Sequence, residues 1–218
     1  ACYNEKENIE KLILKIREYL PESSILIIDD NSPDLTGDLV KKLQRKDFKL
    51  YLTTRNKKLG LDTAHKLAYQ YAIENNYEFL ITMDADLSHD PKELLNFKKN
   101  LEKYPFVIGS RYVHGGKCLM KGFRLVMSKL GNSVIKFFSG IKCSEFTTSY
   151  RGFNIKELNN FHLNHVKQTG YSFFMGTLFE INKKKFEIKE IPIIFADREK
   201  GSSKIPKFEI FRTLINLV

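Results

Sequence analysis

Two acidic pairs, each directly after a short apolar run, are the residues of this sequence best suited to chemistry. One pair is Asp29-Asp30, and the other is formed by the ends of Asp84-Ala85-Asp86. Short β-rich runs between helical patterns are typical of buried parallel strands, and open α/β sheets bind ligands beyond the carboxyl ends of such strands. Carboxylates gathered there in a basic protein favour a divalent cation that carries a phosphorylated ligand. The pattern therefore predicts an enzyme.

The spacing of Asp84 and Asp86 is the sharpest local signal. Two carboxylates separated by one residue can both face a single cation from a turn, and such hard oxygen ligands suit Mg²⁺ or Mn²⁺. A cation held there would neutralise a diphosphate leaving group. The alternative is turn chemistry, because Asp is common at strand ends and helix caps whether or not it binds a ligand. The same alternative holds for Asp29-Asp30.

Isolated cations in predicted loops or at element ends form a second candidate set. They are Arg111, Arg124, Arg151, Arg198 and Lys204. Arginine presents a planar fork that matches pairs of phosphate oxygens, although a single cation is more often a solvated surface residue. Residues 198–204 place cations at both ends of a glycine-centred loop, which is the composition of a lid over phosphates.

The elements that must position these residues alternate between helix and strand. Strand patterns are expected near residues 24–28, 48–53, 79–83, 106–112 and 187–196. Helical patterns are expected near residues 4–20, 34–43, 61–75, 91–103, 122–138, 172–182 and 208–218, the first of them capped by Asn4. This βα alternation predicts an α/β fold with a mostly parallel sheet covered by helices.

Bulk composition limits the classes of protein. A chain of 218 residues is expected to bury one core, and its net charge of +10 favours anionic partners. The three cysteines are scattered, which suits a reducing compartment better than a disulfide scaffold. No apolar run reaches the ~18 residues that span a bilayer. The five histidines show no convincing metal-site spacing, so we assign them no role.

The helical pattern at 122–138 has two faces. Its apolar side carries Phe123, Val126, Met127, Leu130, Val134 and Phe137, and its other side carries Lys121, Lys129 and Lys136. This is the layout of a helix that lies in a membrane interface. It is equally the layout of a helix that packs on its own core.

Six ordered blocks together resemble a known family. They are YNEKEN at 3–8, IDDNSPD at 28–34, KLGL at 58–61, MDADLSH at 83–89, GSRY at 109–112, and Asp197-Arg198 with GSSK at 201–204. In this order they resemble the inverting family-two glycosyltransferases that load polyprenyl phosphates, above all the dolichol-phosphate mannosyltransferases. Glu145 departs from that family, which usually has Asp there.

The resemblance implies a GT-A, Rossmann-like fold that lacks its first strand within this sequence. It implies one domain over 1–218, with a nucleotide-binding part at about 1–112 and an acceptor-facing and membrane-facing part at about 113–218. The implied reaction transfers mannose from GDP-mannose to a polyprenyl phosphate with inversion, assisted by Mg²⁺ or Mn²⁺. The implied location is peripheral, on the cytoplasmic face of a membrane, with any anchoring segment or subunit outside this stretch.

The family's functional residues are carried over position by position. The resemblance implies donor binding by Tyr3, Glu5, Ile28, Asp30, Asp84, Ala85, Asp86, Arg198 and Lys204. It implies metal binding by Asp84, Asp86 and Ser88, and acceptor-phosphate binding by Arg111 and Arg124. Asp86, Arg111, Arg124 and Arg198 are the expected catalytic residues.

Three other interpretations remain open at the level of sequence. A related transferase would move glucose or another sugar, for example from UDP, to undecaprenyl phosphate or a polysaccharide. A receiver-type signalling domain also carries acidic residues at strand ends, but it needs only about 120 residues and leaves the basic second half unexplained. A nucleic-acid-binding module is disfavoured because basic patches interleaved with aromatics are absent, so we expect no nucleic-acid partner.

Overall fold

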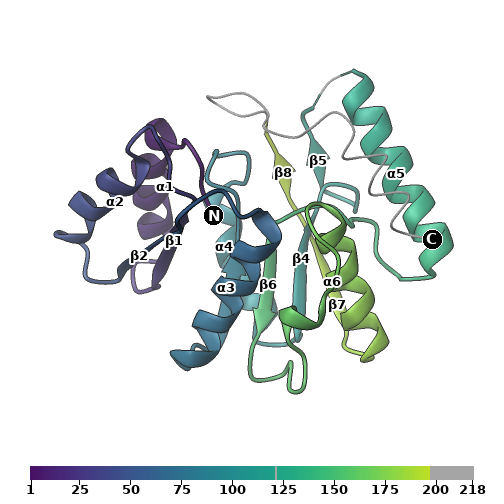
Figure 1. The fold of residues 1–218 in the computed structure, drawn as a ribbon. Coiled ribbons are helices and arrows are strands. Elements are labelled where there is room, and N and C mark those ends of the chain that lie inside the picture. Colours follow the sequence, from purple (N-terminus) through teal and green to yellow (C-terminus); the bar gives the residue numbers. More distant parts are fainter. Residues whose placement is uncertain (121, 197–218) are drawn as a thin grey trace.

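The computed structural model has strands flanked by helices (Figure 1) and describes residues 1–120 and 122–196, with residues 123 and 124 described by their backbone alone. The helices are α1 (Lys6–Tyr19), α2 (Thr36–Gln44), α3 (Leu61–Glu74), η1 (Pro91–Glu93), α4 (Leu94–Leu101), α5 (Phe123–Ser139), η2 (Leu163–His165) and α6 (Ser172–Lys183). The strands are β1 (Ile25–Asp29), β2 (Leu50–Thr54), β3 (Phe79–Thr82), β4 (Phe106–Ser110), β5 (Lys117–Cys118), β6 (Arg151–Asn154), β7 (Ile188–Pro192) and β8 (Ile194–Phe195).

The strands form one central sheet and two small ones. The central sheet has the order β3-β6-β4-β7, while β1 pairs with β2 and β5 pairs with β8. Strand β6 runs antiparallel to both neighbours, and the pairs β1–β2, β4–β7 and β5–β8 are parallel. The predicted α/β fold with mostly parallel strands and flanking helices is therefore confirmed.

Strand β6 is the one central element that the sequence pattern did not predict. It is only four residues long and contains Arg151 and Gly152, neither of which favours a strand. Gly152 is needed because a Cβ atom there would lie 2.9 Å from Leu101 and 3.0 Å from Phe97, both in α4. Close packing of α4 against the sheet therefore explains why β6 has a weak strand signature.

The start of α1 differs from its prediction. Asn4 has a positive φ of 58°, so the helix begins at Lys6 rather than directly after Asn4. The backbone N–H of Lys6 donates to Asp34 at 3.0 Å, and that of Glu5 donates to Thr36 at 3.0 Å. Side chains of the β1–α2 segment thus satisfy this helix end, in place of the predicted cap by Asn4.

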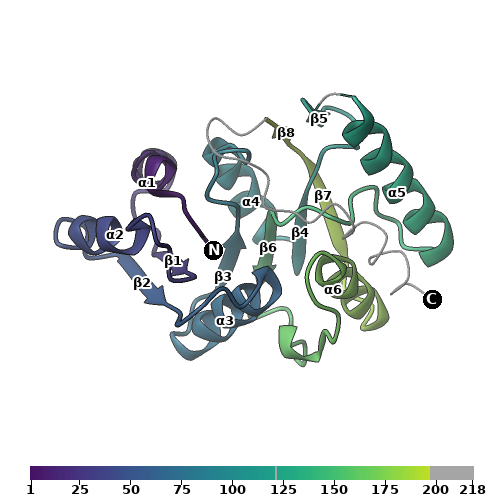
Figure 2. The ribbon, with the colours of Figure 1, turned by 45° about the horizontal axis from the view of Figure 1, so that its top comes forward.

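The central sheet is covered on both faces, with α4 on one side and α3 and α6 on the other (Figure 2). Successive side chains of a strand point to opposite faces. Accordingly, Val107 of β4 belongs to the core cluster that includes Phe97 of α4. Its neighbours Phe106 and Ile108 belong to the cluster formed with α6. This two-sided burial fixes the carboxyl ends of β3 and β4, from which the candidate site is built.

A gap separates β1 from the central sheet. A cavity of about 760 Å³ lies between them, lined by residues of α1, β1, α3, β3 and α4. Cys2 forms an isolated parallel bridge with Asp29 at one end of β1. Among the described residues, no helix is both long enough and apolar enough to span a membrane.

Candidate functional site

The turn after β3 carries the first acidic pair. Thr82, the last residue of β3, donates its hydroxyl to the Ser149 carbonyl at 2.8 Å and so attaches the strand end to the segment before β6. Within the turn, Oδ1 of Asp86 accepts hydrogen bonds from the backbone N–H (3.0 Å) and the hydroxyl (2.6 Å) of Ser88. This local turn orders the Asp86 carboxylate and brings the Ser88 hydroxyl beside it.

Asp84 is held through both its side chain and its backbone. The Ser149 hydroxyl donates to Asp84 Oδ1 at 2.7 Å. The Asp84 backbone N–H donates to Nδ1 of His89 at 3.1 Å. Burial lowers the pKa of His89, an effect that the negative charges of Asp84 and Asp86 oppose. His89 ends the MDADLSH block and Ser149 lies outside the six blocks, but the contacts of both residues with Asp84 are visible only in the folded structure.

The residues of this turn fit a divalent cation that arrives with its own ligand. The described residues contain no group of three His, Cys, Asp or Glu side chains able to hold a metal ion. Asp84 and Asp86 supply two hard oxygen ligands, and magnesium sites often use one or two carboxylates while substrate phosphates and water complete the shell. This donor set fits a metal bound together with a diphosphate.

Both residues of the second acidic pair are buried, but they have different partners. Asp29 accepts hydrogen bonds from the backbone N–H and the hydroxyl of Ser32, so it orders the turn after β1. Asp30 forms a buried ion pair with Arg55, which follows β2. Arg55 also donates to Thr63 (2.5 Å) and to the Gly60 carbonyl (3.1 Å). Arg55 was not predicted, since its partner is 25 residues away in the sequence.

The other predicted donor residues lie around the ends of β1 and β3. Lys58 Nζ lies 4.8 Å from the centre of the Tyr3 ring, a cation–π contact. Glu5 accepts a hydrogen bond from the Asn8 side chain at 2.8 Å. Ile28 and Ala85 are buried, so a bound ligand would meet their backbone rather than their side chains.

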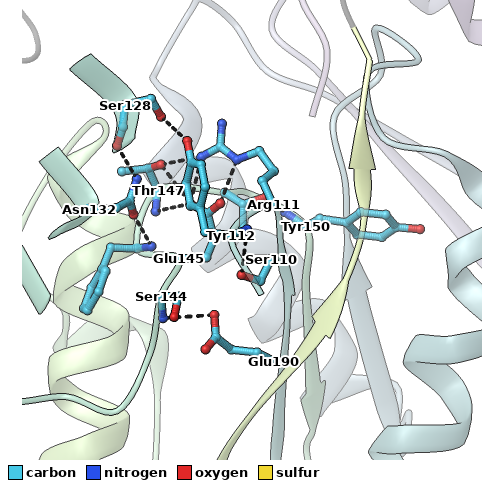
Figure 3. A network of polar contacts seen from close by, with 12 residues as sticks. Ser110, Arg111, Tyr112, Ser128, Asn132, Ser144, Glu145, Thr147, Tyr150 and Glu190 are labelled. Atoms are coloured by element: carbon cyan, nitrogen blue, oxygen red, sulfur yellow. Dashed lines mark hydrogen bonds and ion pairs between the residues drawn. The ribbon is translucent and has the colours of Figure 1, made fainter. Parts of the chain in front are cut away.

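Arg111, directly after β4, is committed to a buried carboxylate (Figure 3). Its Nε and Nη2 donate to Glu145 at 2.6 and 2.8 Å, and Nη2 also donates to Thr147 at 2.8 Å. Burial would raise the pKa of Glu145, but the charge and hydrogen bonds of Arg111 outweigh it and hold that pKa below its ordinary value. The remaining nitrogen, Nη1, makes no hydrogen bond to any residue that the structure describes.

Further hydrogen bonds connect this pair to α5 (Figure 3). The hydroxyls of Tyr112 and Ser128 lie 2.7 Å apart. Oδ1 of Asn132 accepts the backbone N–H of Phe146 at 2.7 Å, immediately after Glu145. The position of α5 is therefore tied to the loop that holds Arg111.

Arg151 is a buried structural residue rather than a loop cation. It is 1% exposed and donates to the carbonyls of Phe146, Thr148 and Phe174. Burial lowers its pKa to about 9. Arg151 was grouped with the candidate phosphate ligands, and that interpretation is wrong because its guanidinium is used inside the protein.

Three predicted site residues are not characterised by side-chain contacts. Arg124 lies in the first turn of α5, and its side chain is outside the described part of the structure. Arg198 and Lys204 also lie outside the described residues. The contacts that the structure does describe bring the acidic turn and Arg111 onto one segment, residues 145–149, which contacts both.

Comparisons with known proteins agree with this site. Residues 1–161 match the model of the family described as "Glycosyl transferase family 2". The chain is 31% identical over 216 residues to an undecaprenyl-phosphate mannosyltransferase of Micrococcus luteus, covering 99% of this chain and 89% of that protein. It is 34% identical over 206 residues to a polyprenol monophosphomannose synthase of Mycolicibacterium smegmatis, covering 93% and 78%.

Solved structures share the fold. A glucosyl-3-phosphoglycerate synthase from Mycobacterium tuberculosis, in complex with Mn²⁺ and UDP-glucose, matches with a TM-score of 0.63 and 13% identity, over 99% of this chain and 73% of that one. A mannosyltransferase from Pyrobaculum calidifontis, in complex with GDP-mannose and Mn²⁺, matches with a TM-score of 0.58 and 18% identity, over 92% and 56%. At these identities the likeness concerns the fold.

Proposed function

The chain belongs to glycosyl transferase family 2, and from this membership and the site we propose that it transfers mannose from GDP-mannose to a polyprenyl phosphate with inversion. The observation that carries the proposal is that one segment, residues 145–149, contacts both the acidic turn after β3 and Arg111. Asp84 and Asp86 suit a metal-bound diphosphate, and Arg111 lies close to the same segment with one edge of its guanidinium unused by described residues. The two mannosyl-transferring relatives cover most of this chain and indicate the sugar and the acceptor.

We assign the metal to the turn after β3. Asp84 and Asp86 would hold Mg²⁺ or Mn²⁺, and the Ser88 hydroxyl, which lies beside Asp86, would be a further ligand. The bound cation would supply charge neutralisation to the leaving diphosphate. The protein's own part is to hold both carboxylates in one orientation, which the bonds from Ser149 and Ser88 support.

The donor would lie between the ends of β1 and β3. Tyr3, Glu5 and Asp30 are assigned to the nucleoside, with backbone contacts from Ile28 and Ala85. The Asp30–Arg55 ion pair supports this assignment, because it fixes the carboxylate that would accept hydrogen bonds from a base or ribose. Arg198 and Lys204 are assigned to the diphosphate on the basis of sequence.

The acceptor needs orientation more than activation. A monoalkyl phosphate is already an oxyanion near neutral pH, because its second pKa is about 6. Arg111, through Nη1, and Arg124 would bind this phosphate and offset its repulsion by the donor diphosphate. Positioned cations of this kind act by preorganised electrostatics and by alignment of the attacking oxygen. Direct attack on the anomeric carbon then inverts its configuration.

A polyprenyl tail stays in the bilayer, so the enzyme must meet its acceptor at a membrane. On α5, Val126, Leu130, Phe137 and Phe138 are between 56% and 81% exposed, with no described element covering them. Lys129 and Lys136 on the same helix are also exposed. An outward apolar face flanked by lysines suits an anionic interface. The protein would bind there peripherally.

Two further parts of the assignment follow from this arrangement. The membrane would be reached from its cytoplasmic face, which the three free thiols support because such thiols suit a reducing compartment. The whole of 1–218 would act as one domain, in which residues 1–112 bind the nucleotide and residues 113–218 meet acceptor and membrane.

A transfer assay with crossed donors and acceptors tests the proposal. Radiolabelled GDP-mannose and UDP-glucose are each incubated with Mn²⁺ and either a polyprenyl phosphate or a polysaccharide. The proposal predicts label in the organic-extractable lipid from GDP-mannose only. Lipid labelled from UDP-glucose would reassign the sugar, and labelled polysaccharide would reassign the acceptor. Absence of metal-dependent sugar-nucleotide binding would favour a non-enzymatic domain.

A further inference from the structure

His89 is a buried side chain for which the proposed reaction has no chemical use. It lies at the end of the acidic turn, five residues after Asp84, and is 1% exposed. Its ring does not form part of any described group of metal-binding side chains. A polar ring buried next to two carboxylates of a catalytic turn nevertheless needs a physical reason, because burying a polar group costs free energy unless it is hydrogen-bonded.

The hydrogen bond from Asp84 defines the state of this imidazole. A backbone N–H can only donate, so Nδ1 of His89 must carry a lone pair at its 3.1 Å contact. The ring is therefore neutral and protonated at Nε2. That nitrogen lies 3.5 Å from the hydroxyl oxygen of Thr148, to which it donates. The ring thus bridges the backbone of Asp84 to Thr148.

Asp84 is consequently held at two atoms by adjacent residues of one segment. Ser149 reaches its carboxylate directly at 2.7 Å, and Thr148 reaches its backbone through His89. The ring has little freedom to move, because the Tyr150 ring lies tilted against it with 4.8 Å between ring centres and the Phe195 ring meets it edge-on at 5.4 Å. This support fixes where the Asp84 carboxylate points.

We infer that His89 is a positioning residue for the metal-binding turn, acting as a neutral hydrogen-bond acceptor that orients Asp84 toward a divalent cation. The inference rests on the proposed metal role of Asp84 and Asp86. Partners that orient a ligand without touching the metal typically change metal affinity by about 10–100-fold when removed.

Two substitutions separate the acceptor from the packing of the ring. His89→Phe keeps an aromatic ring against Tyr150 and Phe195 but removes the acceptor. His89→Asn loses the ring but places a carbonyl oxygen near the position of Nδ1. His89→Leu, closer to histidine in volume, carries the test if the larger phenylalanine prevents folding. His65→Phe is the matched control, because His65 is also buried against aromatic rings but contacts neither Asp84 nor Asp86 by hydrogen bond.

The measurement is the affinity for Mn²⁺ in the presence of GDP, followed by electron paramagnetic resonance of the free ion, on variants with cooperative thermal unfolding. We expect His89→Phe and His89→Leu to weaken Mn²⁺ binding at least tenfold, and His89→Asn and His65→Phe to stay within threefold of wild type. The inference is overturned if the acceptor-free variants bind Mn²⁺ like wild type. It is equally overturned if His89→Asn binds as weakly as His89→Phe.

The same titration, repeated with UDP, distinguishes this inference from the proposed function. If neither GDP nor UDP increases the affinity of the wild-type protein for Mn²⁺ over that in buffer alone, the proposed metal role of Asp84 and Asp86 is wrong. If the wild type binds Mn²⁺ tightly and His89→Phe binds it equally well, only the positioning role of His89 is wrong. Binding with UDP rather than GDP would change the donor and leave the role of His89 in place.

Discussion

Replacement of Glu145 by glutamine isolates the charge of the buried ion pair from its shape. The two side chains are nearly equal in size, but glutamine is neutral and offers one carbonyl oxygen in place of two carboxylate oxygens. In the wild type, these oxygens accept bonds from Arg111 at 2.6 and 2.8 Å and from Thr147 at 3.1 and 3.0 Å. The variant would leave the Arg111 guanidinium without its carboxylate at a site where the residue is only 8% exposed.

The expected loss follows from this burial. Breaking a buried ion pair by removing one partner typically costs about 3–5 kcal/mol. Arg111 would retain its bond to the Thr147 hydroxyl and its contacts with the rings of Tyr112 and Phe195, so we expect the lower end, about 3 kcal/mol. The pKa of Glu145 is lowered on folding, so its contribution is present above its ordinary value of 4.5 and is lost as pH falls through the folded-state pKa. The difference in free energy of unfolding between wild type and Glu145→Gln should therefore become smaller only at acidic pH, where Glu145 is protonated.

Urea unfolding at pH 7 measures this difference. The matched control is Glu22→Gln, because Glu22 bonds Lys49 at 2.6 Å but is 87% exposed, and exposed ion pairs contribute little to stability. The double variant Arg111→Met with Glu145→Leu should be more stable than either of its single variants, since it leaves no unpaired charge. If Glu145→Gln lowers the free energy of unfolding no more than Glu22→Gln does, the Arg111–Glu145 ion pair does not stabilise the fold as a buried pair should.

Three further predictions concern the metal, pH and the membrane. Asp86→Asn should lower turnover at least about 100-fold while the thermal unfolding temperature stays near wild type, since it removes a ligand from the metal that neutralises the diphosphate; normal turnover with EDTA present would refute this. Burial holds the pKa of His65 well below 6.5, so the unfolded state binds a proton that the folded state does not, and stability falls as pH drops below 6.5. In urea unfolding at pH 5.5, His65→Leu should reduce the acid-induced loss in free energy of unfolding by about 1.4 kcal/mol. An unchanged pH profile would mean that His65 does not cause this loss. Lys129→Glu with Lys136→Glu should weaken flotation with anionic liposomes at low salt by about 1 kcal/mol for each lysine that reaches the surface; equal flotation of variant and wild type would mean that these lysines do not face the membrane.

Periodic patterns predicted the elements that frame the site. The helix expected at 61–75 is α3 at Leu61–Glu74, and the one expected at 122–138 is α5 at Phe123–Ser139. Both have long repeats of apolar residues, which are strong signals. The acidic pairs were correctly expected at strand ends, because apolar runs ending in Asp mark where a buried strand leaves the sheet.

Contacts between distant residues could not be predicted in this way. Arg111 meets Glu145 across 34 residues, and Asp30 meets Arg55 across 25. No sequence pattern connects the two residues of either pair. The sequence therefore predicts a phosphate-binding role for Arg111 and does not reveal its buried carboxylate partner. His89 supports Asp84 through a backbone N–H, a group that every residue except proline carries. Only the folded arrangement identifies such supporting residues.

The stereochemistry of the lipid product tests the central claim most directly. The enzyme is incubated with radiolabelled GDP-α-mannose, Mn²⁺ and a polyprenyl phosphate, and the extracted lipid is analysed for the configuration of its mannosyl phosphate. Single inverting attack by the lipid phosphate predicts labelled polyprenyl phosphate mannose in the β configuration. An α-linked product, or label released only as free mannose, would contradict direct transfer to the lipid phosphate at this site.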